Sequence, residues 1–150
     1  MAGLTSAICT TFKKELLEGD HDFNNGADAF KIALFKANAS ISGTYGAATT
    51  NYSDVTGNSD ETTGTGYSSG GNTLTNVDPN TSGTTAFTDF ADTSWTSATF
   101  TTRGAIIYNT NDSNSAVMII DFGADFSVSG GTFTVEFPAA GASTAILRIA

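Results

Sequence analysis

The residues of this chain that could do chemistry begin with a serine in a glycine-rich segment. Residues 66–70 read Gly-Tyr-Ser-Ser-Gly, so Ser68 stands where a hydrolase nucleophile elbow places its serine. That chemistry needs a strand, a sharp turn and a helix around the serine, and a histidine downstream that takes its proton. Here residues 71–74 are poor helix formers, and the one histidine, His21, lies upstream. We interpret the segment as a turn and expect no enzymatic activity.

Carboxylates are the second set of candidates, because they could gather as oxygen ligands for Ca²⁺. None of the groups has the spacing of a Ca²⁺-binding loop, and we interpret them as solvated turn residues. The groups are Asp89 with Asp92, Asp121 with Asp125, and Asp54 with Asp60 and Glu61.

His21 stands between Asp20 and Asp22, but no second histidine or cysteine is near it in the sequence. A single imidazole of this kind is more typical of a surface or an interface than of a metal site. The Asp121-Phe122-Gly123 triplet has the letters of a kinase metal-binding motif, but no other kinase signature is present. We therefore expect no metal site and no cofactor.

The charge limits the classes of partner. The formal net charge is −9, with six Lys and Arg residues and none of them between residues 37 and 102. Nucleic-acid binding depends on basic residues that neutralise phosphates, and so does attraction to an anionic membrane surface, so we expect neither. No stretch approaches the roughly 18 apolar residues of a membrane span. The first 17 residues also lack the pattern of a secretory signal.

One helix is predicted, near the start of the chain. Thr11 can cap a helix over residues 12–18, Phe12 and Leu16 share one face of it, and Gly19 supplies the stop. Two helical turns are not stable alone in water, so this helix must dock on the domain or on a neighbouring subunit. We therefore divide the chain into an N-terminal arm, residues 1–25, and one β-domain, residues 26–150.

The rest of the chain has the pattern of short strands. Alternating or continuous apolar runs separated by turn residues predict strands over residues 30–35, 84–90, 95–102, 105–108, 116–122, 132–137 and 145–149. Residues 40–73 are rich in small polar residues, and we expect a long polar excursion over the surface or into a neighbouring subunit. The spacing predicts an all-β fold, an antiparallel β-sandwich or jelly roll with a short N-terminal helix.

Nine short segments have a recognisable order along the chain: residues 12–17, 19–23, 30–34, 64–71, 89–95, 103–109, 121–123, 131–138 and 146–150. Among them are Gly-Thr-Gly-Tyr-Ser-Ser-Gly-Gly at 64–71 and Arg-Gly-Ala-Ile-Ile-Tyr-Asn at 103–109. As a set they resemble a family of small tailed-bacteriophage virion proteins. The match covers nearly the whole chain and is thinnest over residues 40–59. The resemblance implies a structural role in the virus particle and carries over no catalytic residue.

We therefore expect a non-enzymatic protein of the virion, a capsid decoration (cement) protein. It would form a homotrimer and contact the major capsid protein and its sister subunits, using arm residues Phe12, Leu16, Leu17, His21 and Phe23 as the interface. The alternative is a neck, collar or tail-fibre-associated module that binds host glycans. In that case Trp95 and the tyrosines of residues 45–67 would be exposed for stacking, whereas Trp95, Phe87, Phe90 and Phe100 are otherwise expected in the core.

Overall fold

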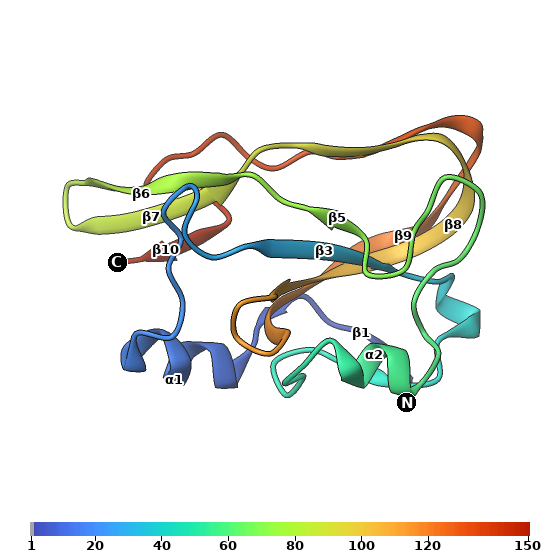
Figure 1. The fold of residues 1–150 in the computed structure, drawn as a ribbon, viewed down its shortest axis with the longest axis horizontal. Helices are drawn as coiled ribbons and strands as arrows, with labels where there is room; N and C mark the ends of the chain where they lie inside the picture. Colours follow the sequence, from blue (N-terminus) through green and yellow to red (C-terminus); the bar gives the residue numbers. More distant parts are fainter. Residues whose placement is uncertain (1) are drawn as a thin grey trace.

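Two long strands, β8 (Thr93–Asn109) and β9 (Ser115–Val135), organise the fold of the computed structural model, which describes residues 2–150. They pair antiparallel from Thr93 opposite Val135 to Asn109 opposite Ser115. The register shifts at several points along this pairing, and such bulges bend a two-stranded ribbon. Figure 1 shows the ribbon turning back near its middle, so that its two halves lie in different layers of a sandwich.

The remaining strands extend these layers. The larger sheet has the order β2-β9-β8-β3-β5, with β2 at Ala7–Ile8, β3 at Phe30–Phe35 and β5 at Asn72–Thr73. A three-stranded sheet has the order β10-β7-β6. Its strands are β6 (Asn76–Ser82), β7 (Thr85–Phe90) and β10 (Leu147–Ile149). All these pairs are antiparallel, which confirms the all-β, sandwich-like fold predicted from the strand pattern.

Several predicted strands are parts of longer ones. The predicted strands over 95–102 and 105–108 are one strand, β8, and those over 116–122 and 132–137 are both within β9. The polar residues that separate them were interpreted as turns. They are accommodated instead by the bend of the ribbon, where Gly123 and Gly130 adopt positive φ angles without interrupting the strand.

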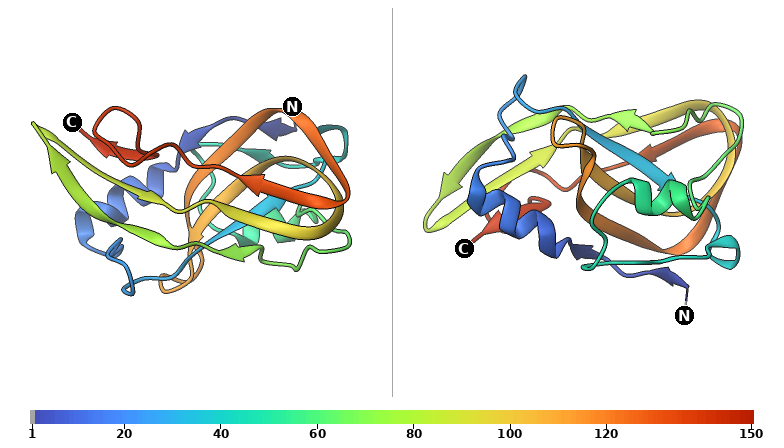
Figure 2. Two further views of the ribbon diagram at one scale, coloured as in Figure 1. Left: turned by 90° about the horizontal axis from the view of Figure 1, so that it is seen from above. Right: turned by 60° about the horizontal axis from the view of Figure 1, so that its bottom comes forward.

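The helices and a small third sheet cover one side of the sandwich. Helix α1 (Thr10–Glu18) and helix α2 (Ser53–Gly57) lie beneath the layer that contains β3 (Figures 1 and 2). Strands β1 (Gly3–Leu4) and β4 (Thr44–Tyr45) pair in parallel, and a 3₁₀ turn, η1, spans Asn38–Ser40. No helix among residues 2–150 is long and apolar enough to cross a membrane.

Residues 2–25 are joined closely to the sandwich. Helix α1 ends at Gly19 in a left-handed conformation, as predicted, but it begins one residue before Thr11 and has no side-chain cap. Phe12 and Phe23 are buried in the same core as Phe30, on which Phe23 stacks with ring centroids 4.4 Å apart. The core therefore continues across residue 25, the boundary drawn from the sequence.

Residues 40–73 are polar but carry their own buried anchors. Tyr45, Val55 and Asp60 are buried, and α2 is a helix that the sequence pattern did not predict. Asp60 accepts hydrogen bonds from the backbone N–H groups of Ser42 and Gly43 and from the Tyr45 hydroxyl, at 2.7–3.1 Å. The segment thus packs on its own subunit through the buried side chains of Tyr45 and Val55, and the hydrogen bonds to Asp60 offset the cost of burying its carboxylate.

Candidate functional site

The glycine-rich segment does not form a nucleophile elbow. The Gly71 N–H donates to the Ser68 carbonyl at 2.9 Å, which closes a turn, and the next element is strand β5 rather than a helix. The Ser69 hydroxyl and the Gly70 N–H both donate to the Glu61 carboxylate, at 2.9 and 2.6 Å. The segment is therefore a turn tied down by Glu61, as the sequence indicated.

One group of side chains among residues 2–150 has the composition of a metal site: Glu15, His21 and Asp112, whose ligand atoms lie within 4.8 Å of one another. The His21 ring is fully buried, and its Nε2 atom is 3.0 Å from Glu15 and 3.9 Å from Asp112. Glu15 also accepts a hydrogen bond of 2.6 Å from Ser115 at the start of β9. Spacing in the sequence does not indicate this group, because its members are up to 97 positions apart (Glu15 to Asp112).

The second ring nitrogen of His21, Nδ1, determines whether this group can bind a metal. Asn109 Nδ2 lies 2.9 Å from His21 Nδ1 and donates to Asp28 at 2.8 Å. The Asn111 N–H donates to Asn109 Oδ1 at 2.9 Å, which fixes the orientation of the amide. Nδ1 is therefore the acceptor and Nε2 carries the proton that Glu15 accepts.

A histidine that ligates a metal through one nitrogen normally donates a proton from the other. His21 has the opposite arrangement, because Nδ1 is already occupied as an acceptor. The group is a hydrogen-bonded hub that ties α1 to the ends of β8 and β9. His21 therefore lies in the buried interior, and the geometry does not favour a metal there.

The carboxylates considered as Ca²⁺ ligands have protein partners. Asp121 pairs with Arg103 at 2.7 Å, and this hydrogen bond lowers the pKa of the Asp121 carboxyl despite its partial burial. Asp60 pairs with Lys36 at 3.1 Å. Asp89 is buried, which raises its pKa, and accepts from the N–H groups of Phe90 and Ile146. The ion pairs and hydrogen bonds of these three carboxylates therefore stabilise the fold.

The five predicted interface residues have different surroundings. Phe12, His21 and Phe23 are buried inside their own subunit, Leu16 is half-buried, and Leu17 is 90% exposed. Three of the five line one concave apolar surface between α1 and the three-stranded sheet, the α1 groove, with a volume of about 230 Å³. Its lining residues are Leu16, His21, Asp22, Phe23, Pro79, Ala86, Phe87, Thr88, Leu147 and Ile149.

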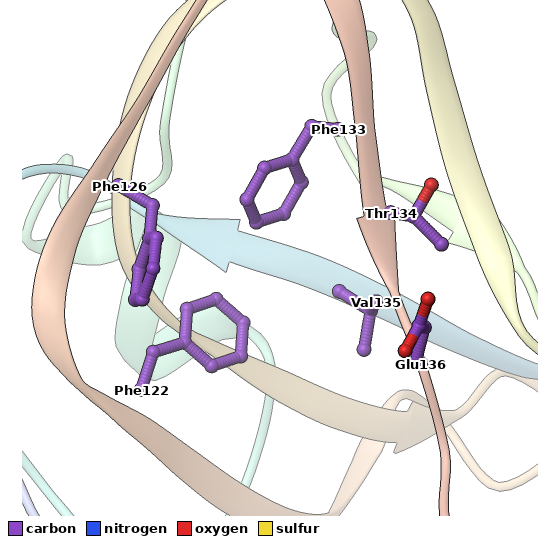
Figure 3. Close-up of a pocket in the computed structure, with 6 residues that line it drawn as sticks. All are labelled: Phe122, Phe126, Phe133, Thr134, Val135 and Glu136. Carbon is purple, nitrogen blue, oxygen red and sulfur yellow. The ribbon is translucent and has the colours of Figure 1, made fainter.

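A second concave surface, the β9 pocket, was not predicted. Figure 3 shows Phe122 and Phe126 on one limb of β9 facing Phe133 on the other limb, across a cavity of about 290 Å³. Its remaining lining residues are Thr134, Val135 and Glu136. Phe126 is 47% exposed. Among the described strands, β2 is the one that pairs with the edge of β9 opposite β8, and it does so at Met118 and Ile119 alone.

Phe122 and Phe133 pack against the hydrophobic core, and each is half-buried at the rim of this pocket. The alternation of apolar residues in β9 indicates which side chains share a face. It does not reveal that the strand folds back on itself, so this local pattern could not locate the pocket.

The aromatic residues proposed for glycan stacking are mostly inside the protein. Trp95 is 3% exposed and packs near Tyr67, Phe100 and Phe133. Tyr45 is also buried. Trp95 is therefore a core residue, as expected from the strand pattern, because β8 turns this ring into the core, and it presents no face for stacking.

The chain matches no protein-family model, no curated protein and no solved structure. The assignment of a function therefore depends on the geometry described above and on the resemblance of the sequence segments.

Proposed function

We propose that this protein is a bacteriophage capsid decoration protein, a non-enzymatic component of the virion that binds the outside of the head shell and stabilises it. Its partners would be the major capsid protein and sister subunits, in a homotrimer. The resemblance of nine sequence segments to small tailed-phage virion proteins supports this class of function. The turn that follows Ser68 in place of a helix, and the hydrogen bonds that occupy His21 and the carboxylate groups, support a role without catalysis.

The observation that carries the proposal is the α1 groove. It is apolar, it is open to solvent, and Ile149 at its rim is 58% exposed. Exposed apolar surfaces of this kind on a folded domain are typical of sites that contact another protein. We assign the contact with the major capsid protein to this groove.

Binding to decoration-free shells tests the assignment. Shells assembled from the major capsid protein are mixed with the purified chain and sedimented, and the bound fraction is measured against concentration. We expect saturable binding that is weakened about tenfold or more by Ile149→Asp, because a carboxylate would have to be desolvated at an apolar contact. Ser82→Asp, at an exposed position on β6 of the same sheet, is the matched control and should bind as the natural protein does.

Copy number gives an independent test. A decoration protein covers the shell, so gel densitometry of purified virions should give hundreds of copies when the band is compared with that of the major capsid protein. A handful of copies per virion, or no saturable binding to shells, would overturn the proposal. The neck, collar or tail-fibre alternative predicts the low copy number together with binding on a glycan array.

A further inference from the structure

We propose that copies of this chain associate head to tail, with Leu17 of one copy seated in the β9 pocket of the next. The proposal rests on the association of sister subunits suggested above and names the two surfaces that make it. It concerns different side chains from those assigned to the capsid contact, since Leu17 does not line the α1 groove.

The first surface is the outer face of α1. Leu17 is 90% exposed, the most exposed large apolar side chain among the described residues, and a leucine gains little from that position in a monomer. Lys13 lies one helical turn before it and is also exposed, so the two side chains are neighbours on the helix surface. Lys13 forms no ion pair with any residue that the structure describes.

The second surface is the β9 pocket. The rings of Phe122, Phe126 and Phe133 form its apolar wall, and Glu136 lies at its rim (Figure 3). Its volume, about 290 Å³, is at the small end of ligand-binding pockets, which suits one or two side chains better than a larger ligand. Glu136 is exposed and has no ion-pair partner among the described residues.

Charge favours a second copy of the chain as the occupant. With a net charge of −9, two copies repel each other unless a basic surface of one meets an acidic surface of the other. Three of the six basic residues already pair with carboxylates of their own chain, namely Lys14 with Glu18, Lys36 with Asp60 and Arg103 with Asp121. Of the other three, Lys13 is the one that lies beside Leu17 on α1, and its charge complements that of Glu136 beside the phenylalanine rings.

The two surfaces lie toward opposite ends of the molecule. Figure 1 places α1 at one end of the long axis, whereas the ribbon of β8 and β9 turns back at the other. One copy cannot bring its own α1 into its own β9 pocket, so the contact joins different surfaces of successive copies. Such a heterologous contact closes into a ring when the rotation between copies allows it.

Analytical ultracentrifugation of the free protein, without any shell, tests the association. We expect a concentration-dependent oligomer, and we expect Leu17→Asp and Phe126→Asp each to weaken it about tenfold or more. Lys13→Glu should weaken it about two- to fivefold, and adding Glu136→Lys to the same chain should restore it, because every contact then joins a glutamate at position 13 to a lysine at position 136. Ser82→Asp carries its substitution at an exposed position on β6 that lines neither surface, and it serves as a control for added charge.

A cross-linking experiment tests the head-to-tail geometry. Leu17→Cys and Phe126→Cys are made as separate variants, and each is oxidised alone and then in a mixture. We expect a disulfide-linked dimer in the mixture and no dimer from either variant alone, because like surfaces do not meet. Cys9 does not interfere, since it is fully buried.

Two results would overturn the inference: a free protein that stays monomeric at high concentration, or dimers from the single variants that match those from the mixture. The proposed capsid role has its own readout in shell sedimentation. A monomer that binds shells saturably would overturn the head-to-tail contact alone, whereas an oligomer that does not bind shells would overturn the capsid role alone.

Discussion

Asn109 and His21 lie 88 positions apart in the chain, and their side chains meet in the interior with Asn109 Nδ2 2.9 Å from His21 Nδ1. The Asn109 amide donates to Asp28 and accepts from the Asn111 N–H, so its orientation is fixed and its NH₂ group donates to His21 Nδ1. His21 is thereby fixed as the neutral tautomer that donates from Nε2 to Glu15. This relationship separates a structural hub from a metal site with the same residue types.

The first prediction concerns metal binding at this hub. Because Nε2 carries a proton and Nδ1 is an occupied acceptor, adding Zn²⁺ or removing metal with EDTA should leave the Tm unchanged. Differential scanning calorimetry measures this directly, and ¹⁵N-detected NMR of His21 should show the proton on Nε2. A Tm that rises with Zn²⁺ concentration and saturates would contradict the assignment.

The second prediction concerns the N-terminal residues. Deleting residues 1–25 removes Cys9, Phe12 and Phe23 from the core, and each loss of a large buried side chain costs about 2–5 kcal/mol. Because domains are stable by only about 5–15 kcal/mol, we expect the truncated chain to be unfolded or aggregated by circular dichroism. Leu17→Ser, at an exposed position on the same helix, should keep the native spectrum. A folded truncated chain would show that the core does not depend on these residues.

The strand pattern was sufficient to predict the fold class because alternation reports burial locally. Phe30, Ile32 and Leu34 are buried as their period-two spacing indicated, whereas Ala33 and Phe35 on the other face of β3 are buried as well, which the alternation did not predict. The hub and the β9 pocket could not be predicted in this way. Glu15 and Ser115 meet only because α1 packs on the start of β9, and Phe126 faces Phe133 only because the ribbon bends. Such long-range relationships depend on the tertiary fold and cannot be recognised from the local sequence pattern.

The third prediction concerns Gly71, between the Glu61-bound turn and β5. Its φ is +70°, and a Cβ atom there would lie 1.8 Å from the Ile32 carbonyl oxygen on β3. Gly71→Ala should therefore lower the free energy of unfolding by about 3 kcal/mol or more, through strain and the displaced β5 strand. Gly57→Ala, where a Cβ meets no atom within 4 Å, should change it by less than about 1 kcal/mol. Urea denaturation measures both, and equal effects would contradict this account.

The fourth prediction uses Cys9 as a reporter of unfolding. Burial, together with the nearby carboxylates of Glu15 and Asp54, raises the pKa of the thiol to about 12. The thiolate is the reactive form, so the native protein should react with a thiol reagent at pH 8 only as fast as it opens. The rate should match that of a free cysteine once the chain is unfolded in urea. Rapid labelling of the native protein would show that α1 opens locally or that the thiol is exposed.

The fifth prediction concerns acid stability and Asp60, whose side chain is fully buried. Burial by itself would raise its pKa, but hydrogen bonds from Ser42, Tyr45, Gly43 and Lys36 outweigh it and lower the pKa to about 2. A carboxyl with a pKa of about 3.9 when unfolded then contributes roughly 2 kcal/mol of stability above pH 4, and loses it as the pH falls from about 4 to 2. Urea midpoints measured across this range should fall with pH. Asp60→Asn should be less stable at pH 7 and show a shallower fall, whereas an equally steep fall would assign the acid sensitivity to other carboxylates.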